Sequence, residues 1–432
     1  MNFFPFFDLI ASRGGPLWYL GFLGLPLLGV VGAGPAGGRI GKRADSDLPE
    51  FVNGLLDGSV TPGQLRERVK SYSTPEKVSL VLNNSCNLAC KHCYLQVPRL
   101  NGEPLSALEW ETLTASILDG GSPFVSLAGK EIFLSKRNVE LLARIDAINE
   151  ERGHPSRLGV VTNGTLIEPY RPLLKRLHLD YLDISIDGAA EDHDAIRGTG
   201  AFEAARPNVE WAAREMPAPF FLSMTVHRRN FERIGAALAA FQGLGVSNVG
   251  LGFMVPTRRT DPALTLGTTE IEATLSNLSA LGSIPLVRPM KVVFELNTHT
   301  PEGLVAFLRS PWFVGDAIES DRFDNPWIEH RLKNGLLLQF KFLVMPSSAS
   351  RTARITPEGH YLALDDVFET GRYVENSLAN VRDHGLDYAK ILRAARQHPR
   401  FHEILDDYER QILPELRRAY SEGFRVNRRL AA

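Results

Sequence analysis

The sequence predicts an α/β fold built as a partial (β/α)6 parallel barrel. From residue 76 onward, short apolar segments typical of strands alternate with segments whose apolar residues recur at helical spacing. Successive parallel strands need crossover connections, and helices supply them with right-handed geometry. The chain has 432 residues, of which 44% are hydrophobic and 23% are charged. These values are typical of a globular chain with a substantial core, and they exclude a disordered chain or a coiled coil.

Six segments are predicted to form the barrel strands, namely residues 78–82, 125–127, 158–161, 182–186, 220–226 and 249–254. Residues 105–118, 138–149 and 234–244 are predicted as helices between them. Barrels of this kind place their active sites at the carboxyl ends of the strands. We therefore expect functional residues directly after the predicted strands.

Three further segments surround this barrel, which we place at residues 76–285. Residues 1–43 form an apolar N-terminal segment, residues 44–75 a linker and lead-in helix, and residues 286–432 a C-terminal extension. Residues 285–357 have a less regular pattern, whereas residues 386–424 are predicted to form charge-rich helices. The extension is therefore expected to be rich in α-helix.

The N-terminal segment is predicted to anchor the chain to a membrane. Residues 14–38, between Arg13 and Arg39, contain no charged side chain, and about 20 apolar residues suffice to cross a bilayer. Lys42 and Arg43 follow Arg39, so the positive-inside rule places the rest of the chain in the cytoplasm. Glycines and prolines in the segment disfavour a helix. A hairpin-like membrane dip or a soluble packing arm stays open as an alternative.

Two other partners are disfavoured by the sequence. Gly32, Gly34 and Gly37 have the G-x-G-x-x-G spacing of a dinucleotide-binding loop, but residues 38–43 lack the apolar stripe of the helix that must follow it. A flavin or nicotinamide site is therefore a weak alternative. The formal net charge of −2 provides no positive field for a phosphate backbone, which argues against nucleic acid as the main partner.

A cluster of cysteines follows the first predicted strand. Cys86, Cys90 and Cys93 are the only cysteines of the chain, and so compact a group indicates ligands in a reducing compartment rather than a disulfide framework. Three thiolates in one loop can hold a four-iron cluster and leave one iron without a protein ligand. A zinc site completed by His92, or buried structural cysteines, are the alternatives.

Together with further motifs, this loop resembles that of the radical S-adenosylmethionine (radical SAM) enzymes. The segment from Ala128 to Ile132 stands where the family has a glycine-glycine-glutamate-proline turn, with Lys130 and Ile132 as departures. Residues 162–165 and 185–188 match the third-strand and fourth-strand motifs, and residues 193–202 also follow the pattern of the branch that includes peptide-modifying maturases. The resemblance covers residues 76–260.

This resemblance implies one 4Fe-4S cluster on the three cysteines, with S-adenosylmethionine (SAM) bound at its open iron. No catalytic residue is predicted beyond the groups that bind the two cofactors. The expected SAM contacts are His92, Tyr94, Gly129, Glu131, Thr162, Asn163, Ser185, Asp187, Arg197 and Phe253.

Some of these residues also have a structural alternative to SAM binding. The alternatives are a salt bridge for Arg197, support of the loop for Asp187, a solvated side chain for His92 or Glu131, a simple turn for Thr162 and Asn163, and a core position for Phe253 or Met254.

The implied reaction is reductive cleavage of SAM with an electron from a flavodoxin-type or ferredoxin-type donor, followed by hydrogen abstraction from a substrate carbon. Residues 356–366 and 375–381 resemble the SPASM or twitch region of maturases with its cysteines replaced. No auxiliary cluster can then be held by cysteine, so we expect a single cluster and either a redox-neutral outcome or hydrogen return from the cofactor or another residue.

The substrate is expected to be a peptide or an amino-acid derivative. A membrane anchor would favour a lipid or a small metabolite instead. A catalytically silent, membrane-tethered binding subunit is the alternative from another functional class.

Overall fold

The computed structural model describes residues 48–72, 74–93, 102–256, 260–298, 300–320, 326–346, 352–363 and 377–430. The predicted N-terminal anchor, the glycine motif at residues 32–37 and Tyr94 lie outside these ranges. Within them, no helix has the length and apolar character that a membrane span requires.

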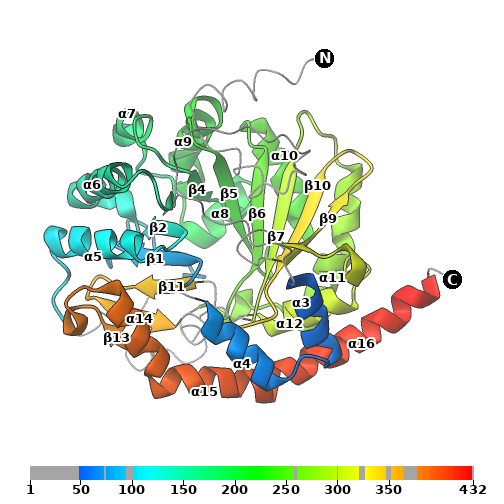
Figure 1. The fold of residues 1–432 in the computed structure, drawn as a ribbon. Coiled ribbons are helices and arrows are strands. Elements are labelled where there is room, and N and C mark those ends of the chain that lie inside the picture. The colour runs from blue at the N-terminus through cyan, green and yellow to red at the C-terminus, as the bar shows by residue number, and fades with distance from the viewer. Residues whose placement is uncertain are drawn as a thin grey trace, which may run out of the picture.

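A single twisted sheet forms the centre of the molecule, with helices packed around it (Figure 1). Its first six strands lie side by side in chain order, and each pairs in parallel with the next. The predicted α/β class and all six predicted strands are confirmed. The strands are β1 (Lys77–Val81), β2 (Phe124–Ala128), β3 (Arg157–Thr162), β4 (Tyr181–Ser185), β5 (Phe220–Val226) and β6 (Asn248–Phe253).

The sheet continues beyond these strands at both edges. Strands β7 (Lys291–Leu296) and β10 (Leu337–Phe342) extend it in parallel after β6, while β11 (Thr352–Ile355) pairs in parallel with β1. The outermost pairings are antiparallel and involve β8 (Glu319–Ser320), β9 (Pro326–Arg331), β12 (His360–Ala363) and β13 (Ser377–Asn380). Much of the less regular region at residues 285–357 is thus strand.

Helices fill the crossovers, as predicted. Local sequence explains where helices begin. Ser106 and Glu109 form a reciprocal capping box at the start of the helix Ala107–Asp119, and Thr61 and Gln64 do the same for the helix Pro62–Ser71. The crossover helices are α5 (Ala107–Asp119), α6 (Lys136–Glu151), α7 (Arg171–Leu174), α8 (Ala190–Arg197), α9 (Ala201–Glu215), α10 (Ile234–Gly243), α11 (Thr268–Asn277) and α12 (Pro301–Arg309).

A second group of helices runs along one edge of the molecule (Figure 1). The C-terminal helices of this group confirm the predicted helical character of the chain end, and α16 packs against both α3 and α12. N-terminal and C-terminal parts of the described chain therefore meet. The group comprises α3 (Leu48–Asp57), α4 (Pro62–Ser71), α14 (Tyr388–Gln397), α15 (Pro399–Asp407) and α16 (Leu413–Leu430).

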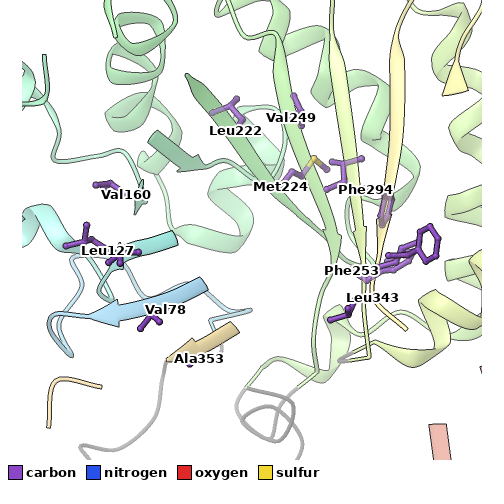
Figure 2. Close-up of a cluster of buried hydrophobic side chains, with 14 of the residues drawn as sticks. Val78, Leu127, Val160, Leu222, Met224, Val249, Phe253, Phe294, Leu343 and Ala353 are labelled. Carbon is purple, nitrogen blue, oxygen red and sulfur yellow. The ribbon is translucent and has the colours of Figure 1, made fainter. Parts of the chain in front are cut away.

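The two faces of the sheet differ in chemistry. On β4 and β5, the side chains of Leu182, Ile184 and Leu222 are 0% exposed and belong to the apolar core on the helix-covered face (Figure 2 shows Leu222). The alternating positions Asp183 and Ser223 are half-buried and lie on the opposite face. We call this opposite face, which the curved sheet encloses, the concave face.

Candidate active site

The cysteine loop follows β1 at the carboxyl edge of the sheet. All three cysteines are free thiols; Cys90 is buried, whereas Cys86 and Cys93 are half-buried. Burial raises the pKa of Cys90 to about 11, the Arg197 guanidinium lowers it, and the other two thiols raise it further. Cys90 therefore lies in the electrostatic field of Arg197 and of the other two cysteines.

Amide groups hold the loop and approach one of its sulfur atoms. The Asn163 side chain donates to Asn87 Oδ1 at 2.9 Å and to Cys86 Sγ at 3.6 Å, and the Leu88 backbone N–H lies 3.4 Å from the same sulfur. Asn87 in turn donates to Thr165 Oγ1 at 2.8 Å. Hydrogen bonds to thiolate sulfur stabilise and tune iron-sulfur clusters, so these residues fit such a group.

Within the described ranges, no group of three or more His, Cys, Asp or Glu side chains, the three cysteines included, is arranged as a metal site. This finding does not distinguish the zinc alternative from an iron-sulfur cluster. His92, the candidate fourth zinc ligand, directs Nε2 to Asp187 Oδ2 at 3.1 Å.

Glu131 joins the turns that follow β2 and β3. It is 0% exposed, so the alternative of a solvated carboxylate is wrong. Its carboxylate accepts hydrogen bonds from Thr162 Oγ1 at 2.7 Å, from the Asn163 N–H at 2.8 Å and from the Phe133 N–H at 3.0 Å. Burial raises the pKa of this carboxyl, and the three donors oppose the rise.

Gly129 allows the cysteine loop to approach this turn closely. A Cβ atom at Gly129 would lie 3.1 Å from Asn83 Oδ1, closer than side chains normally pack. Asn83 in turn donates to the Glu131 carbonyl at 2.9 Å. The glycine is therefore explained by the contact between the loop and the turn.

Arg197, Asp187 and His92 form a buried charged group behind the cysteines. Arg197 Nε donates to Asp187 Oδ2 at 2.6 Å, so Arg197 takes part in the salt bridge that was the alternative to SAM binding. Burial tends to raise the pKa of Asp187, but Arg197 and His92 outweigh it and hold the pKa well below its ordinary value. Asp187 is therefore ionised, and its contacts are those of a residue that supports the loop.

Two histidines near Asp187 were not predicted from the sequence. His193 Nδ1 accepts from the Asp187 N–H at 3.2 Å, and the rings of His227 and His92 meet edge to face at 6.2 Å between centroids. Burial lowers the pKa of His193 and of His227 to about 4 each, so both are neutral at pH 7. Their signal in the sequence was their position shortly after predicted strands.

Phe253 lies away from the cysteine loop. Its ring packs at 4.9 Å from that of Phe294, on the face covered by α12, where a Cβ at Gly303 would lie 2.6 Å from the Phe253 ring (Figure 2). This core position argues against an adenine contact for Phe253. Met254 instead packs with Ile196, whose carbonyl accepts from the Lys91 N–H of the cysteine loop.

Ser185 lies half-buried at the carboxyl end of β4, on the same strand face as Asp183. Its hydroxyl makes no side-chain hydrogen bond within the described ranges. The expected methionine-carboxylate contact at Ser185 stays a prediction.

The segment that contains these residues matches a known protein family. Residues 80–253 match the model of the Radical SAM superfamily. These residues therefore form a radical SAM domain. The match contains the cysteine loop and the strand ends that carry Glu131, Asn163 and Asp187.

Relatives with assigned names include enzymes of two kinds. The radical SAM chain is 33% identical over 195 residues to an AdoMet-dependent heme synthase of Methanosarcina barkeri, covering 44% of this chain and 53% of the relative. It is 27% identical over 186 residues to the sporulation killing factor maturation protein SkfB of Bacillus subtilis, covering 43% of each chain. The chain thus spans about half the length of the curated relatives it matches.

Solved structures share the fold at low sequence identity. The structure of histidine-tagged anSMEcpe with bound AdoMet has a TM-score of 0.53 and 14% identity, covering 78% of this chain and 84% of that one. Streptococcus suis SuiB bound to precursor peptide SuiA has a TM-score of 0.51 and 14% identity, covering 83% and 71%. These likenesses bear on the fold of this radical SAM chain.

Proposed function

We propose that this chain is an enzyme that binds one 4Fe-4S cluster and SAM, and abstracts a hydrogen atom from a carbon of a peptide or amino-acid derivative. The observation that carries the proposal is the cysteine loop. Three free thiols lie in one loop after β1, and amide N–H groups point to Cys86 Sγ.

Cys86, Cys90 and Cys93 would hold the cluster. When bound, the cluster supplies the electron that cleaves SAM to methionine and the 5'-deoxyadenosyl radical. The electron itself would come from an external donor of the flavodoxin or ferredoxin type. No other cysteine exists in the chain to ligate an auxiliary cluster, which supports a single cluster and a redox-neutral outcome.

The residues around the loop position it. Asn163 and Asn87 fix the loop to the turn after β3, while Glu131 fixes that turn to β2. The ionised Asp187 holds the Arg197 guanidinium, whose positive charge acts on Cys90 and favours the thiolate form that a cluster needs. We propose Ser185, Glu131 and Gly129 as the contacts for the methionine part of SAM, and Met254 for its adenine.

Maturases among the relatives support a peptide substrate, since SkfB and the mycofactocin maturase MftC of Mycobacterium tuberculosis both match over the barrel. A small metabolite is the second candidate, because AdoMet-dependent heme synthase relatives reach 33% identity.

Formation of 5'-deoxyadenosine tests the proposal. Protein purified without oxygen and given SAM and dithionite should release 5'-deoxyadenosine, and Cys93→Ala should abolish the release. Asp119→Asn, a change at an exposed helix end, is the matched control and should keep it. A flavoprotein would instead be yellow and free of iron, and a silent binding subunit would bind SAM without cleaving it. Either result contradicts the proposal.

A further inference from the structure

The concave face carries a polar strip beneath the cysteine loop. Ser223 Oγ on β5 donates to Asp183 Oδ2 on β4 at 2.8 Å, and the strand register sets Ser185 beside Ser223. Asp183, Ser185 and Ser223 are each half-buried, although they lie in the middle of the parallel sheet. Apolar packing therefore does not fill this part of the concave face.

An aromatic floor closes the strip on the side away from the cysteines. The Tyr181 ring lies 5.1 Å from the Phe124 ring and 6.5 Å from the Phe221 ring, and the Tyr181 hydroxyl is 3.1 Å from Ser126 Oγ. Since strand residues rise about 3.3 Å each, Asp183 sits one layer above this floor. Ser185 occupies the next layer toward the cysteine loop.

Asp183 has an oxygen atom that lacks a partner. Its Oδ1 is buried and accepts no hydrogen bond from any described residue. Burial raises the pKa of Asp183 to about 6, Ser223, Lys77 and Arg197 lower it, and Glu295 of β7 raises it. A buried acceptor without a donor costs free energy, so a bound molecule that supplies a donor would stabilise this site.

The facing side of the sheet carries a second buried acceptor without a partner. Gln339 on β10 is 1% exposed, and its Oε1 has no hydrogen-bond partner in the described structure. Strand register places Gln339 beside Val293, on the same face as the exposed Glu295. On this side, Lys291 pairs with Glu329 Oε2 at 3.5 Å. Asp183 Oδ1 and Gln339 Oε1 are thus two buried acceptors without a hydrogen-bond partner in the described structure.

We propose that the concave face binds a substrate that carries an ammonium group, with Asp183 Oδ1 as its acceptor. The proposal rests on the proposed function, which places the reaction at the cysteine loop above this layer. An ammonium group has three donors and a positive charge, and it forms stronger hydrogen bonds with a carboxylate than a neutral donor does. Glu295 adds a second carboxylate to the same face. The ammonium group belongs to a lysine side chain of a peptide or to a free amine.

Binding of three small probes to the cluster-loaded protein tests this site by NMR. N-acetyl-lysine methylamide represents a peptide, 1-pentylamine a free amine, and N-acetyl-norleucine methylamide lacks the ammonium group. We expect the wild type to prefer the lysine probe or the amine over the norleucine probe. Asp183→Asn should weaken ammonium binding at least about tenfold, while Asp119→Asn leaves it unchanged. The ammonium probe whose binding is weakened by Asp183→Asn shows whether the bound ammonium group belongs to a peptide or to a free amine.

A second variant keeps the test sharp if Asp183→Asn folds poorly. Ser223→Ala removes a donor that lowers the pKa of Asp183, so the pH midpoint of ammonium binding should rise. If neither ammonium probe binds better than the norleucine probe, or if Ser223→Ala does not move the pH midpoint, the ammonium site is overturned. Iron content and 5'-deoxyadenosine release of the wild type are measured in parallel. Their absence overturns the proposed function, whereas their presence with Asp183-independent binding overturns only the ammonium site.

Discussion

Glu131 shows how one buried carboxylate organises the turns at the edge of the sheet. Its three donors come from two different segments, so it fixes both turns in one arrangement. Glu131→Gln places an NH2 group against at least one of these donors, and we expect it to lower the free energy of unfolding by about 2 kcal/mol or more. Urea denaturation of the reduced protein measures this. Glu67→Gln, at a surface pair, should change it by less than about 1 kcal/mol.

Arg197 compensates a buried charge. Arg197→Met leaves Asp187 ionised without its main partner and should cost about 3–5 kcal/mol at pH 7. Arg197 depresses the pKa of Asp187 in the folded wild type, so its contribution is present above the unfolded pKa of about 3.9 and declines as pH falls below it. Wild type and variant should therefore converge toward acid pH in urea titrations. A gap that stays constant down to a pH of about 3 would show that packing, not charge, makes the difference.

The burial of neutral His193 and His227 predicts a second pH dependence of stability, at higher pH than that of Asp187. Both have a pKa of about 4 in the folded protein, against about 6.5 in an unfolded chain. The unfolded chain binds more protons between these values, so stability is complete above a pH of about 6.5 and is lost as pH falls toward about 4. His227→Gln should flatten this slope by about one proton. Identical slopes for both proteins would refute neutral burial of His227.

At the scale of the element, a glycine sets how closely α12 approaches the sheet. A Cβ at Gly303 would lie 2.6 Å from the Phe253 ring, so Gly303→Ala should destabilise the fold by about 1–3 kcal/mol. Phe253→Ala combined with Gly303→Ala should show positive coupling in a double-mutant cycle of thermal unfolding. Gly243→Ala in α10, where nothing lies within 4 Å of the added Cβ, is the neutral control. If the two substitutions had additive effects on stability, the contact between α12 and Phe253 would be contradicted.

Strand alternation explains what the sequence revealed and what it did not. Short segments rich in apolar residues identified all six barrel strands. Phe253 was assigned to the cofactor, yet it shares a face with Val249 and Leu251, and the period of two would have placed it in the core. Asp183 was not predicted as a site residue, because the sequence alone does not show that this side of the strand lines the concave face.

At the scale of the whole molecule, residues distant in sequence complete the sheet and its surroundings. Strands β7, β10 and β11 had little signal because their polar residues, such as Lys291, Gln339 and Arg354, interrupt the apolar pattern. The cysteine loop was predictable because its three cysteines are close in sequence. Asn163 and Arg197, which act on these cysteines, come from a turn and a helix that only the fold brings near.

Iron analysis with electron paramagnetic resonance of the reduced protein is the most direct test of the cofactor assignment. We predict about four iron and four sulfide per chain, a signal from a reduced cluster, and a change in that signal when SAM is added. The change should be absent from the protein with all three cysteines replaced by alanine. A cluster whose spectrum ignores SAM, or a chain without iron after anaerobic reconstitution, would contradict the account.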